Sequence, residues 1–181
     1  MDKDREIALI RDCQHGDRKA LDTLVRHFEK PVYNAAYRML GNKDEAADVT
    51  QTAFMKVFEN INRFDPNYRL FSWIYRIALN EAVNQLGRRK KVEPLEELPY
   101  QDGDVLQDCL AASQLEANVQ AILMELHEDH RKVIVLHYFT DCSYRHIGEI
   151  LNLPEKTVKS RLFTARQQLK NRLQQHGIFH A

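Results

Sequence analysis

The residues best suited to binding nucleic acid lie near the middle of the 181-residue chain. Six of its 16 aromatic side chains fall between Phe58 and Tyr75, which is a tenth of the sequence. Basic and amide residues follow directly, ending in the run Arg88-Arg89-Lys90-Lys91. Aromatic rings stack on unpaired bases at about 1–3 kcal/mol each, while Lys and Arg follow the phosphate backbone. This segment therefore predicts binding of unpaired nucleic acid.

Core packing is the alternative explanation for these aromatics, because Phe58 and Trp73 would also fit between two amphipathic helices. Phe64 and Tyr68 instead fall in a polar stretch containing Asp-Pro, which is typical of a loop. Side-chain amides can bind a base edge once the base has left its stack. The candidates for this interface are Phe64, Trp73, Arg76, Asn80, Asn84, Arg88, Arg89, Lys90 and Lys91.

A second candidate interface lies near the C-terminus, in the segment SYRHIGEILNLPEKTVKSRLFTARQQLKNRL. A short periodic stretch, a break at Asn152-Leu153-Pro154 and a longer periodic stretch are typical of a helix-turn-helix. The second helix of that motif enters the DNA major groove. An ordinary helical hairpin with a solvated basic face is the alternative. The candidates outside the apolar stripe of the longer helix are Lys156, Lys159, Ser160, Phe163 and Arg166.

Catalytic and metal chemistry have little support in the sequence. His127 and His130, and likewise Cys142 and His146, have helical spacing, but two ligands so spaced are common by chance. There is no Gly-rich phosphate loop, nucleophile elbow, CxxC or HExxH motif. We therefore expect no catalytic residue, no metal and no cofactor, and hence no enzyme. The three widely spaced cysteines (Cys13, Cys109, Cys142) argue against a disulfide framework, with packing thiols as the default and redox sensing left open.

These candidates have to be positioned by helices, because apolar residues recur with helical spacing along nearly the whole chain. We expect an all-α fold without strands. Ala47 and Leu115 are assigned to buried stripes, and Pro31 is expected to kink or break its helix. The expected helices cover residues 4–14, 17–40, 44–61, 71–89, 129–139 and 143–151, with further helices beginning near 115 and 154, the last of them with Pro154 at its first position.

The charge distribution divides the chain into three parts. Residues 1–92 carry 17 Lys and Arg against 13 Asp and Glu, residues 93–130 carry none against 10, and residues 131–181 carry 9 against 3. Two basic blocks separated by an acidic one suggest two polyanion-binding surfaces. We expect an N-terminal helical bundle (1–92), a flexible acidic linker (93–114) and a helix-turn-helix domain (115–181). Our hypothesis is that the linker and packing between the domains mask the basic faces.

The sequence predicts neither a membrane-spanning segment nor a signal peptide. There is no run of about 18 apolar residues, so the chain is not expected to insert into a membrane. The first residues lack an apolar stretch long enough for a signal peptide, so a cytoplasmic location is expected.

Three segments in order, YRMLGNKDEAADVTQTAFMKVFENI, FSWIYRIALNEAVNQL and SYRHIGEILNLPEKTVKSRLFTAR, resemble bacterial sigma factors of the sigma-70 family, specifically the extracytoplasmic-function (ECF, group 4) type. The resemblance extends from about Ala20 to Leu173, apart from the linker. It implies a non-catalytic specificity subunit that binds core RNA polymerase and directs initiation at promoter DNA.

The resemblance also implies roles for particular residues. The helix at 44–61 would dock on the clamp helices of the largest polymerase subunit through Asp44, Glu45, Asp48, Gln51 and Phe54. The aromatic-basic segment would capture the promoter minus-ten element as a single strand, with Phe64, Trp73, Arg76, Asn80 and Asn84 facing flipped bases. The last helix would read the minus-thirty-five element through Lys156, Thr157, Lys159, Ser160, Arg161, Phe163 and Arg166.

The resemblance further implies contact with the polymerase flap and with an anti-sigma factor linked to the membrane. A helix-turn-helix regulator whose N-terminal domain senses a ligand or a partner protein is the competing interpretation. It accounts for the helix-turn-helix but leaves the aromatic-basic segment unexplained.

Overall fold

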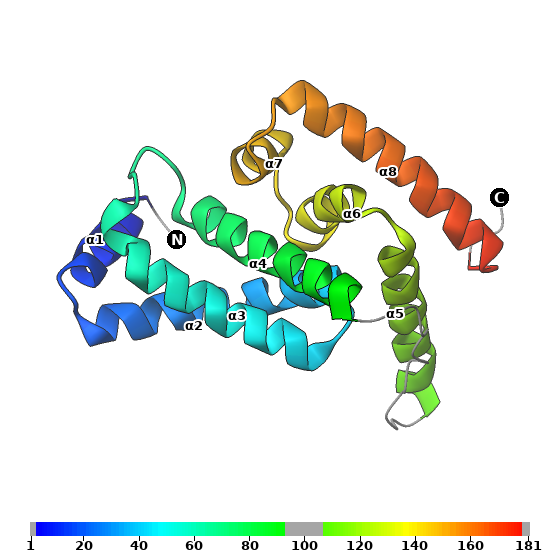
Figure 1. Ribbon diagram of the computed structural model, residues 1–181, viewed down its shortest axis with the longest axis horizontal. Coiled ribbons are helices and arrows are strands. Elements are labelled where there is room, and N and C mark those ends of the chain that lie inside the picture. Colours follow the sequence, from blue (N-terminus) through cyan, green and yellow to red (C-terminus); the bar gives the residue numbers. More distant parts are fainter. Residues whose placement is uncertain (1–2, 93–106, 179–181) are drawn as a thin grey trace.

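The computed structural model describes residues 3–92 and 107–178, and this part of the chain is helical without any strand (Figure 1). The all-α expectation is thereby confirmed, in two helical regions. The elements are α1 (Lys3–Gln14), α2 (Arg18–Leu40), α3 (Lys43–Asn60), a 3-10 turn (Ile61–Arg63), α4 (Leu70–Val92), α5 (Gln107–Glu125), α6 (Glu128–Ile134), a π-helical turn (Val135–Phe139), α7 (Tyr144–Leu151) and α8 (Glu155–Gln175).

Local sequence sets the ends of the N-terminal helices. The Asp17 carboxylate accepts a hydrogen bond from the Lys19 backbone N–H at 2.8 Å and caps the start of α2. Gly41 ends α2 in the left-handed region (φ 70°), which glycine adopts without steric cost. The Asn42 side chain then caps α3 by accepting from the Glu45 N–H at 3.0 Å. These caps produce the tight α2–α3 corner.

Pro31 does not break α2, contrary to one of the two outcomes expected for it, and the helix runs through it to Leu40. Pro31 itself is exposed, whereas Phe28, Val32 and Ala35 are buried on the opposite side. A proline inside a helix costs about 3 kcal/mol. Burial of the continuous apolar face outweighs that cost, because each large buried side chain contributes about 1.5–3 kcal/mol.

Three details differ from the sequence expectation. Ala47 is exposed, because α3 presents Ala46, Val49 and Ala53 to the core instead. Leu115 is 51% exposed, so it lies outside the apolar stripe assigned to it. Helix α5 begins at Gln107, inside the segment assigned to the linker. The rest of that segment, residues 93–106, lies outside the described residues.

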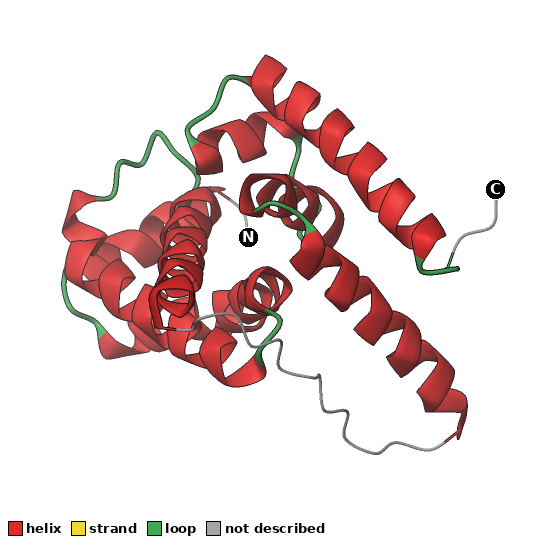
Figure 2. Cartoon of the chain, turned by 45° about the vertical axis from the view of Figure 1, so that its right-hand side comes forward, coloured by secondary structure: helices red, strands yellow, loops and turns green. Residues whose placement is uncertain are grey.

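The two helical regions pack directly on each other. Helices α2, α3 and α4 lie side by side, and α1 packs across one end of them (Figures 1 and 2). Ile10 and Cys13 of α1 join buried residues of the other three helices in one apolar cluster. A second buried cluster contains Met39, Leu40 and Leu79 from the N-terminal region together with Leu123 and Ile147 from the C-terminal region. Packing between the domains was a hypothesis of the sequence analysis, but none of these core residues had been assigned to it. We call the two parts of the described chain, residues 3–92 and 107–178, the N-terminal and C-terminal halves.

None of the described helices combines the length and hydropathy that crossing a bilayer requires.

Candidate nucleic-acid interfaces

The first candidate interface is one face of α4. Trp73, Arg76, Asn80 and Asn84 follow one another at intervals of three or four residues, so they share this face. Asn80 and Asn84 are exposed, whereas Trp73 and Arg76 are half-buried. The exposed amides present donors and acceptors to solvent, as the predicted contact with unpaired bases requires.

A pocket of about 200 Å³ opens beside this face, between α4 and the loop that precedes it. Phe64 is only 6% exposed and packs on Trp73, with ring centroids 5.2 Å apart, so Phe64 forms a wall of the pocket in the unbound chain. The Ser72 hydroxyl is buried and has no hydrogen-bond partner within the described residues. The lining residues are Arg63, Phe64, Asp65, Tyr68, Ser72, Trp73 and Arg76.

Ser72 was missed in the sequence analysis. Its signal is a polar residue placed between buried positions, since Leu70 and Ile74 on either side of it are both fully buried. A buried hydroxyl without a partner costs about 1–3 kcal/mol, which a ligand with a suitable polar edge would recover. The pocket thus combines three aromatic side chains, Phe64, Tyr68 and Trp73, with one buried hydroxyl that has no partner, a chemistry suited to a nucleobase.

The basic run after α4's exposed amides is only partly available. Arg88 is exposed, but Arg89 forms an ion pair with Glu45 of α3 and donates to the Leu40 carbonyl oxygen at 3.2 Å. Arg89, a predicted nucleic-acid contact, is therefore paired with Glu45, a predicted polymerase contact. The side chains of Lys90 and Lys91 lie outside what the structure describes.

The residues of α3 that were predicted to dock on polymerase differ in their exposure to solvent. Asp44, Asp48 and Gln51 are exposed, whereas Phe54 is 6% exposed. A mostly apolar groove of about 700 Å³ lies between α2 and α3, and the exposed Met55 is among its lining residues. Of the five predicted docking residues, Gln51 and Phe54 line this groove and Asp44, Glu45 and Asp48 do not.

The second candidate interface is built on a tight helix-turn-helix formed by α7 and α8. The Ser143 hydroxyl caps α7 by accepting from the His146 N–H at 3.3 Å, and Asn152 ends α7 in the left-handed region (φ 54°). Gly148 permits the closeness of the turn, because a Cβ there would lie 2.7 Å from the Leu153 carbonyl oxygen. Pro154 is the residue before α8 rather than its first helical residue, so the helix begins at Glu155, one residue later than expected.

Helix α8 presents most of its predicted contact residues to solvent. Lys156, Lys159 and Ser160 are exposed and Phe163 is 64% exposed. Thr157 is half-buried. A large apolar side chain in the middle of a helix leaves most of its surface in solvent when it is this exposed, and contact with a thymine methyl would cover part of it.

Several of these cations are already oriented by neighbours. Lys159 pairs with Glu155 at 2.9 Å, and its Nζ lies 5.8 Å from the centre of the Tyr144 ring. Arg161 is half-buried, 3.6 Å from the Asp129 carboxylate. The Lys132 and Arg161 cations hold the pKa of Asp129 below its ordinary value against the opposing effect of desolvation, which is the largest single influence on it.

Arg166 is the last predicted contact on α8. It is half-buried, and its guanidinium stacks over the Tyr138 ring at 5.6 Å. Such a cation–π contact holds the side chain in one orientation on the helix face.

Among the described side chains, the remaining nucleophiles and potential metal ligands form no reactive-thiol or metal site. Burial raises the pKa of the Cys13 and Cys142 thiols, so both favour the unreactive protonated form. The side chain of Cys109 lies outside the described residues. Among the side chains that the structure describes, no group of three or more His, Cys, Asp or Glu is placed to hold a metal ion.

Comparisons with known proteins match both halves. The family profile Sigma-70 region 2 matches residues 24–92, and Sigma-70, region 4 matches residues 116–169. The chain is 34% identical over 176 residues to the ECF RNA polymerase sigma factor SigW of Bacillus subtilis, covering 91% of this chain and 94% of that protein. It is 32% identical over 178 residues to the ECF RNA polymerase sigma-E factor of Escherichia coli, covering 92% and 93%.

Two solved structures share the fold. CnrH, solved in complex with the cytosolic domain of CnrY, has a TM-score of 0.74 at 26% identity and is matched over 96% of this chain and 98% of CnrH. The sigma factor RpoE of Bartonella quintana, solved with the anti-sigma factor NepR, has a TM-score of 0.67 at 23% identity, with coverage of 86% and 98%.

Proposed function

The chain belongs to the extracytoplasmic-function type of the sigma-70 family, and we propose that it binds core RNA polymerase and directs initiation through two separate promoter contacts. The N-terminal half docks on polymerase and captures the minus-ten element as a single strand, and the C-terminal half reads the minus-thirty-five element as a duplex. The alternative, a helix-turn-helix regulator that is not a sigma factor, is not favoured. It would have a sensor domain in the N-terminal half, but the profile Sigma-70 region 2 matches residues 24–92 there.

The observation that carries the single-strand contact is the pocket beside α4. Its aromatic walls Phe64 and Trp73, the buried Ser72 hydroxyl and the nearby exposed Asn80 together suit a base that has left the duplex. Separating one DNA stacking step costs about 1.4 kcal/mol. Stacking a base on an aromatic side chain returns about 1–3 kcal/mol, so a few captured bases offset much of the opening.

The exposed face of α8 supports the duplex contact. Phe163 and Ser160 can touch base edges, while Lys156 and Lys159 can neutralise phosphates. Because the α7–α8 turn is fixed by Gly148, these side chains lie on a rigid support. A rigid support suits sequence reading, since little conformational entropy is lost when DNA binds.

The groove between α2 and α3 supports polymerase docking. It is mostly apolar, and the exposed carboxylates of Asp44 and Asp48 lie on the same helix, α3. A partially apolar patch with a polar rim is typical of non-obligate protein interfaces. The clamp helices of the largest subunit are its proposed occupant, and the flap is the proposed partner of the C-terminal half. The protein would therefore act in the cytoplasm, with the polymerase.

Regulation by an anti-sigma factor is the remaining part of the proposal. It rests on the likeness to RpoE, which was solved with the anti-sigma factor NepR, and to CnrH, which was solved with the cytosolic domain of CnrY. A partner with a separate cytosolic domain also has a part outside the cytosol, which supports, for this chain too, an anti-sigma factor linked to the membrane.

The test is open-complex formation by purified protein and core polymerase on a cognate promoter. Asn80→Ala should reduce open complexes at least tenfold while leaving polymerase binding within twofold of wild type. Asn34→Ala, which also removes an exposed helical amide, is the matched control and should change neither. Equal effects of the two variants, or loss of polymerase binding with Asn80→Ala, would refute the assignment of the α4 face to DNA.

A further inference from the structure

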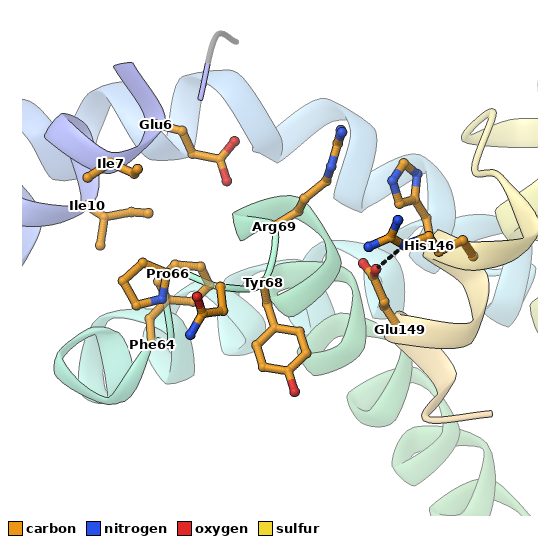
Figure 3. A pocket seen from close by; sticks show the side chains of 11 residues that line it. Glu6, Ile7, Ile10, Phe64, Pro66, Tyr68, Arg69, His146 and Glu149 are labelled. Carbon is orange, nitrogen blue, oxygen red and sulfur yellow. Dashed lines mark hydrogen bonds and ion pairs between the residues drawn. The ribbon is translucent and has the colours of Figure 1, made fainter. Parts of the chain in front are cut away.

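A cavity of about 490 Å³ lies between α1, the loop that precedes α4 and α7 (Figure 3). Cavities of about 300–1,000 Å³ have the size that holds a small organic ligand. The walls are mostly charged or polar, and Ile7, Ile10, Phe64 and Pro66 form the apolar part. The groove proposed for polymerase docking shares none of the lining residues. The proposed function therefore leaves this cavity without a role.

The wall that α7 contributes is held in place by α4. Arg76 donates through Nε to the Ile150 carbonyl oxygen at 3.2 Å and through Nη2 to the Glu149 carbonyl oxygen. The His146 ring packs edge-on against Phe71, with centroids 5.2 Å apart. The side chains that α7 presents to the cavity thus form a preformed surface, which lowers the entropy lost when a ligand binds.

Arg69 is the cation of this cavity without a partner, since it forms no hydrogen bond or ion pair with any described residue. The other charges are occupied. Arg145 pairs with Glu149 at 3.3 Å, and the Glu6 carboxylate accepts a backbone N–H at the start of α4 at 2.6 Å. Figure 3 shows the Arg69 side chain extending between Glu6 and His146. The cavity therefore offers one guanidinium to an anionic group of a ligand.

The His146 imidazole can bind the same anion. Burial is the largest influence that lowers the pKa of His146, and the Arg69 and Arg145 cations lower it further against the opposing effect of Glu149. The ring is therefore uncharged at neutral pH, and one of its nitrogens can donate a hydrogen bond. A guanidinium binds phosphate oxygens in a fork. One guanidinium and one imidazole match a single phosphate group better than a chain of phosphates.

The rest of the cavity suits a planar ring with polar edges. Tyr68 is 53% exposed, so its ring can stack on a planar group of the ligand. The Asn67 amide and the second oxygen of the Glu6 carboxylate can bond the donors and acceptors of a base edge. A phosphate joined to such a ring is the chemistry of a nucleotide.

Two lining residues, Phe64 and Tyr68, also line the pocket beside α4. Phe64 is buried and packs on Trp73, so it stays in place as a wall common to both spaces. The exposed Tyr68 ring cannot stack on a ligand in the cavity and on an unpaired base in the pocket at the same time. Occupation of one space therefore opposes occupation of the other.

We propose that this cavity binds a nucleoside monophosphate, with its phosphate at Arg69 and His146 and its base on Tyr68, and that this nucleotide competes with single-stranded DNA for the Tyr68 ring. The competition rests on the proposed function of α4, whereas the nucleotide site does not. By linkage, the factor by which the nucleotide weakens single-strand binding equals the factor by which the single strand weakens nucleotide binding.

The site is tested by calorimetric titration of the full chain with AMP, GMP, CMP and UMP in turn and with inorganic phosphate. At least one nucleotide should bind about tenfold more tightly than inorganic phosphate, because the base stacks on Tyr68. Arg69→Gln should weaken that binding about tenfold, since a charge-assisted hydrogen bond is lost. Arg63→Gln is the matched control: Arg63 is also exposed but lines only the pocket beside α4, so nucleotide affinity should stay within about twofold of wild type.

The competition is tested with a fluorescent single-stranded 12-mer of random sequence, with and without saturating nucleotide. The nucleotide should weaken single-strand binding about tenfold, whereas inorganic phosphate at the same ionic strength should reproduce only the effect of salt. Tyr68→Ala should abolish the difference between nucleotide and phosphate. Tyr68→Phe should keep it, because the stacking ring remains.

The outcomes separate this inference from the proposed function. Absence of nucleotide binding, or equal losses with Arg69→Gln and Arg63→Gln, would overturn the site. Inorganic phosphate that binds as tightly as every nucleotide would overturn the placement of the base on Tyr68. Nucleotide binding that depends on Arg69 but leaves single-strand affinity unchanged would overturn the competition alone. Nucleotide binding that depends on Arg69, with no single-strand binding by any variant, would uphold the site and refute the proposed role of α4.

Discussion

The Arg131 guanidinium of the C-terminal half lies 2.5 Å from the Met39 carbonyl oxygen of the N-terminal half. Its other nitrogen, Nη2, donates to the carbonyl oxygens of Met124 and Leu126 at 2.7 and 2.9 Å. Burial lowers the pKa of Arg131 to about 10, which still leaves the side chain charged at neutral pH. A buried cation surrounded by backbone carbonyls therefore ties the α5–α6 turn to the end of α2.

Replacing this cation should destabilise the whole molecule. Arg131→Met keeps an apolar side chain of similar length but leaves three carbonyl oxygens without their donor. We expect the free energy of unfolding in urea to fall by about 2–4 kcal/mol. Arg145→Met is the control, because the Arg145 side chain is 82% exposed, and it should change the free energy by less than about 0.5 kcal/mol. Equal effects of the two substitutions would contradict the structural role of Arg131.

Removing the Ser72 hydroxyl should raise the stability of the chain but weaken its function. Ser72→Ala removes a buried group without a partner, so the free energy of unfolding should rise by about 1 kcal/mol. The same change should weaken open-complex formation, because the pocket loses its polar group. Thr50→Val is the matched control: the Thr50 hydroxyl donates to the Ala46 carbonyl oxygen at 2.6 Å, and its removal should give no gain in stability. A Ser72→Ala protein less stable than wild type would contradict this account of the pocket.

Two glycines in helices should respond to alanine with opposite sign. At Gly148 the new methyl group would lie 2.7 Å from the Leu153 carbonyl oxygen, so Gly148→Ala should force the turn apart and cost about 1–3 kcal/mol. At Gly87 nothing lies within 4 Å of the added atom, so Gly87→Ala should stabilise the chain by about 0.5–1 kcal/mol. Thermal unfolding of both variants measures the difference. A stable Gly148→Ala protein with unchanged duplex affinity would show that the turn is not closely constrained.

Substitutions on the α8 face should distinguish residues that contact bases from residues that contact phosphates. Phe163→Ala should relax sequence preference in the minus-thirty-five duplex with little change in stability, since Phe163 is 64% exposed. If Lys159 contacts phosphate, Lys159→Ala should weaken all duplexes alike and reduce the slope of log affinity against log salt by about 1. Binding titrations at several salt concentrations with matched and mismatched duplexes measure both. Loss of sequence preference on Lys159→Ala would assign it to a base edge instead.

Local features of the fold were predictable from sequence because their causes are local. The cap at Asp17, the left-handed glycine at Gly41 and the break at Asn152 each depend on residues within one helical turn, and the helix ends fall close to the expected positions. Pro31 shows the limit of that reasoning. Its local cost is opposed by burial of Phe28 and the rest of the apolar face, which depends on other helices.

The particular contacts between the halves were not predictable, because they join residues far apart in sequence. The carbonyl oxygens that bind Arg76 lie 73 and 74 residues away, and a backbone carbonyl leaves no signature in the amino-acid pattern. Arg131 belongs to a basic block that suggests a solvated surface, yet it is buried. The proposed contact residues were selected by type and spacing, which cannot reveal that Phe64 packs against Trp73 in the unbound chain.

Bringing core RNA polymerase to promoters is the central role proposed for this chain. The most direct test adds the purified protein to core RNA polymerase on fragments of a whole bacterial genome and maps the transcript start sites. We predict discrete start sites that share a duplex-read element and, downstream of it, a melted element, and that are lost with Asn80→Ala. Start sites identical to those of core enzyme alone, from folded protein and active polymerase, would contradict the account.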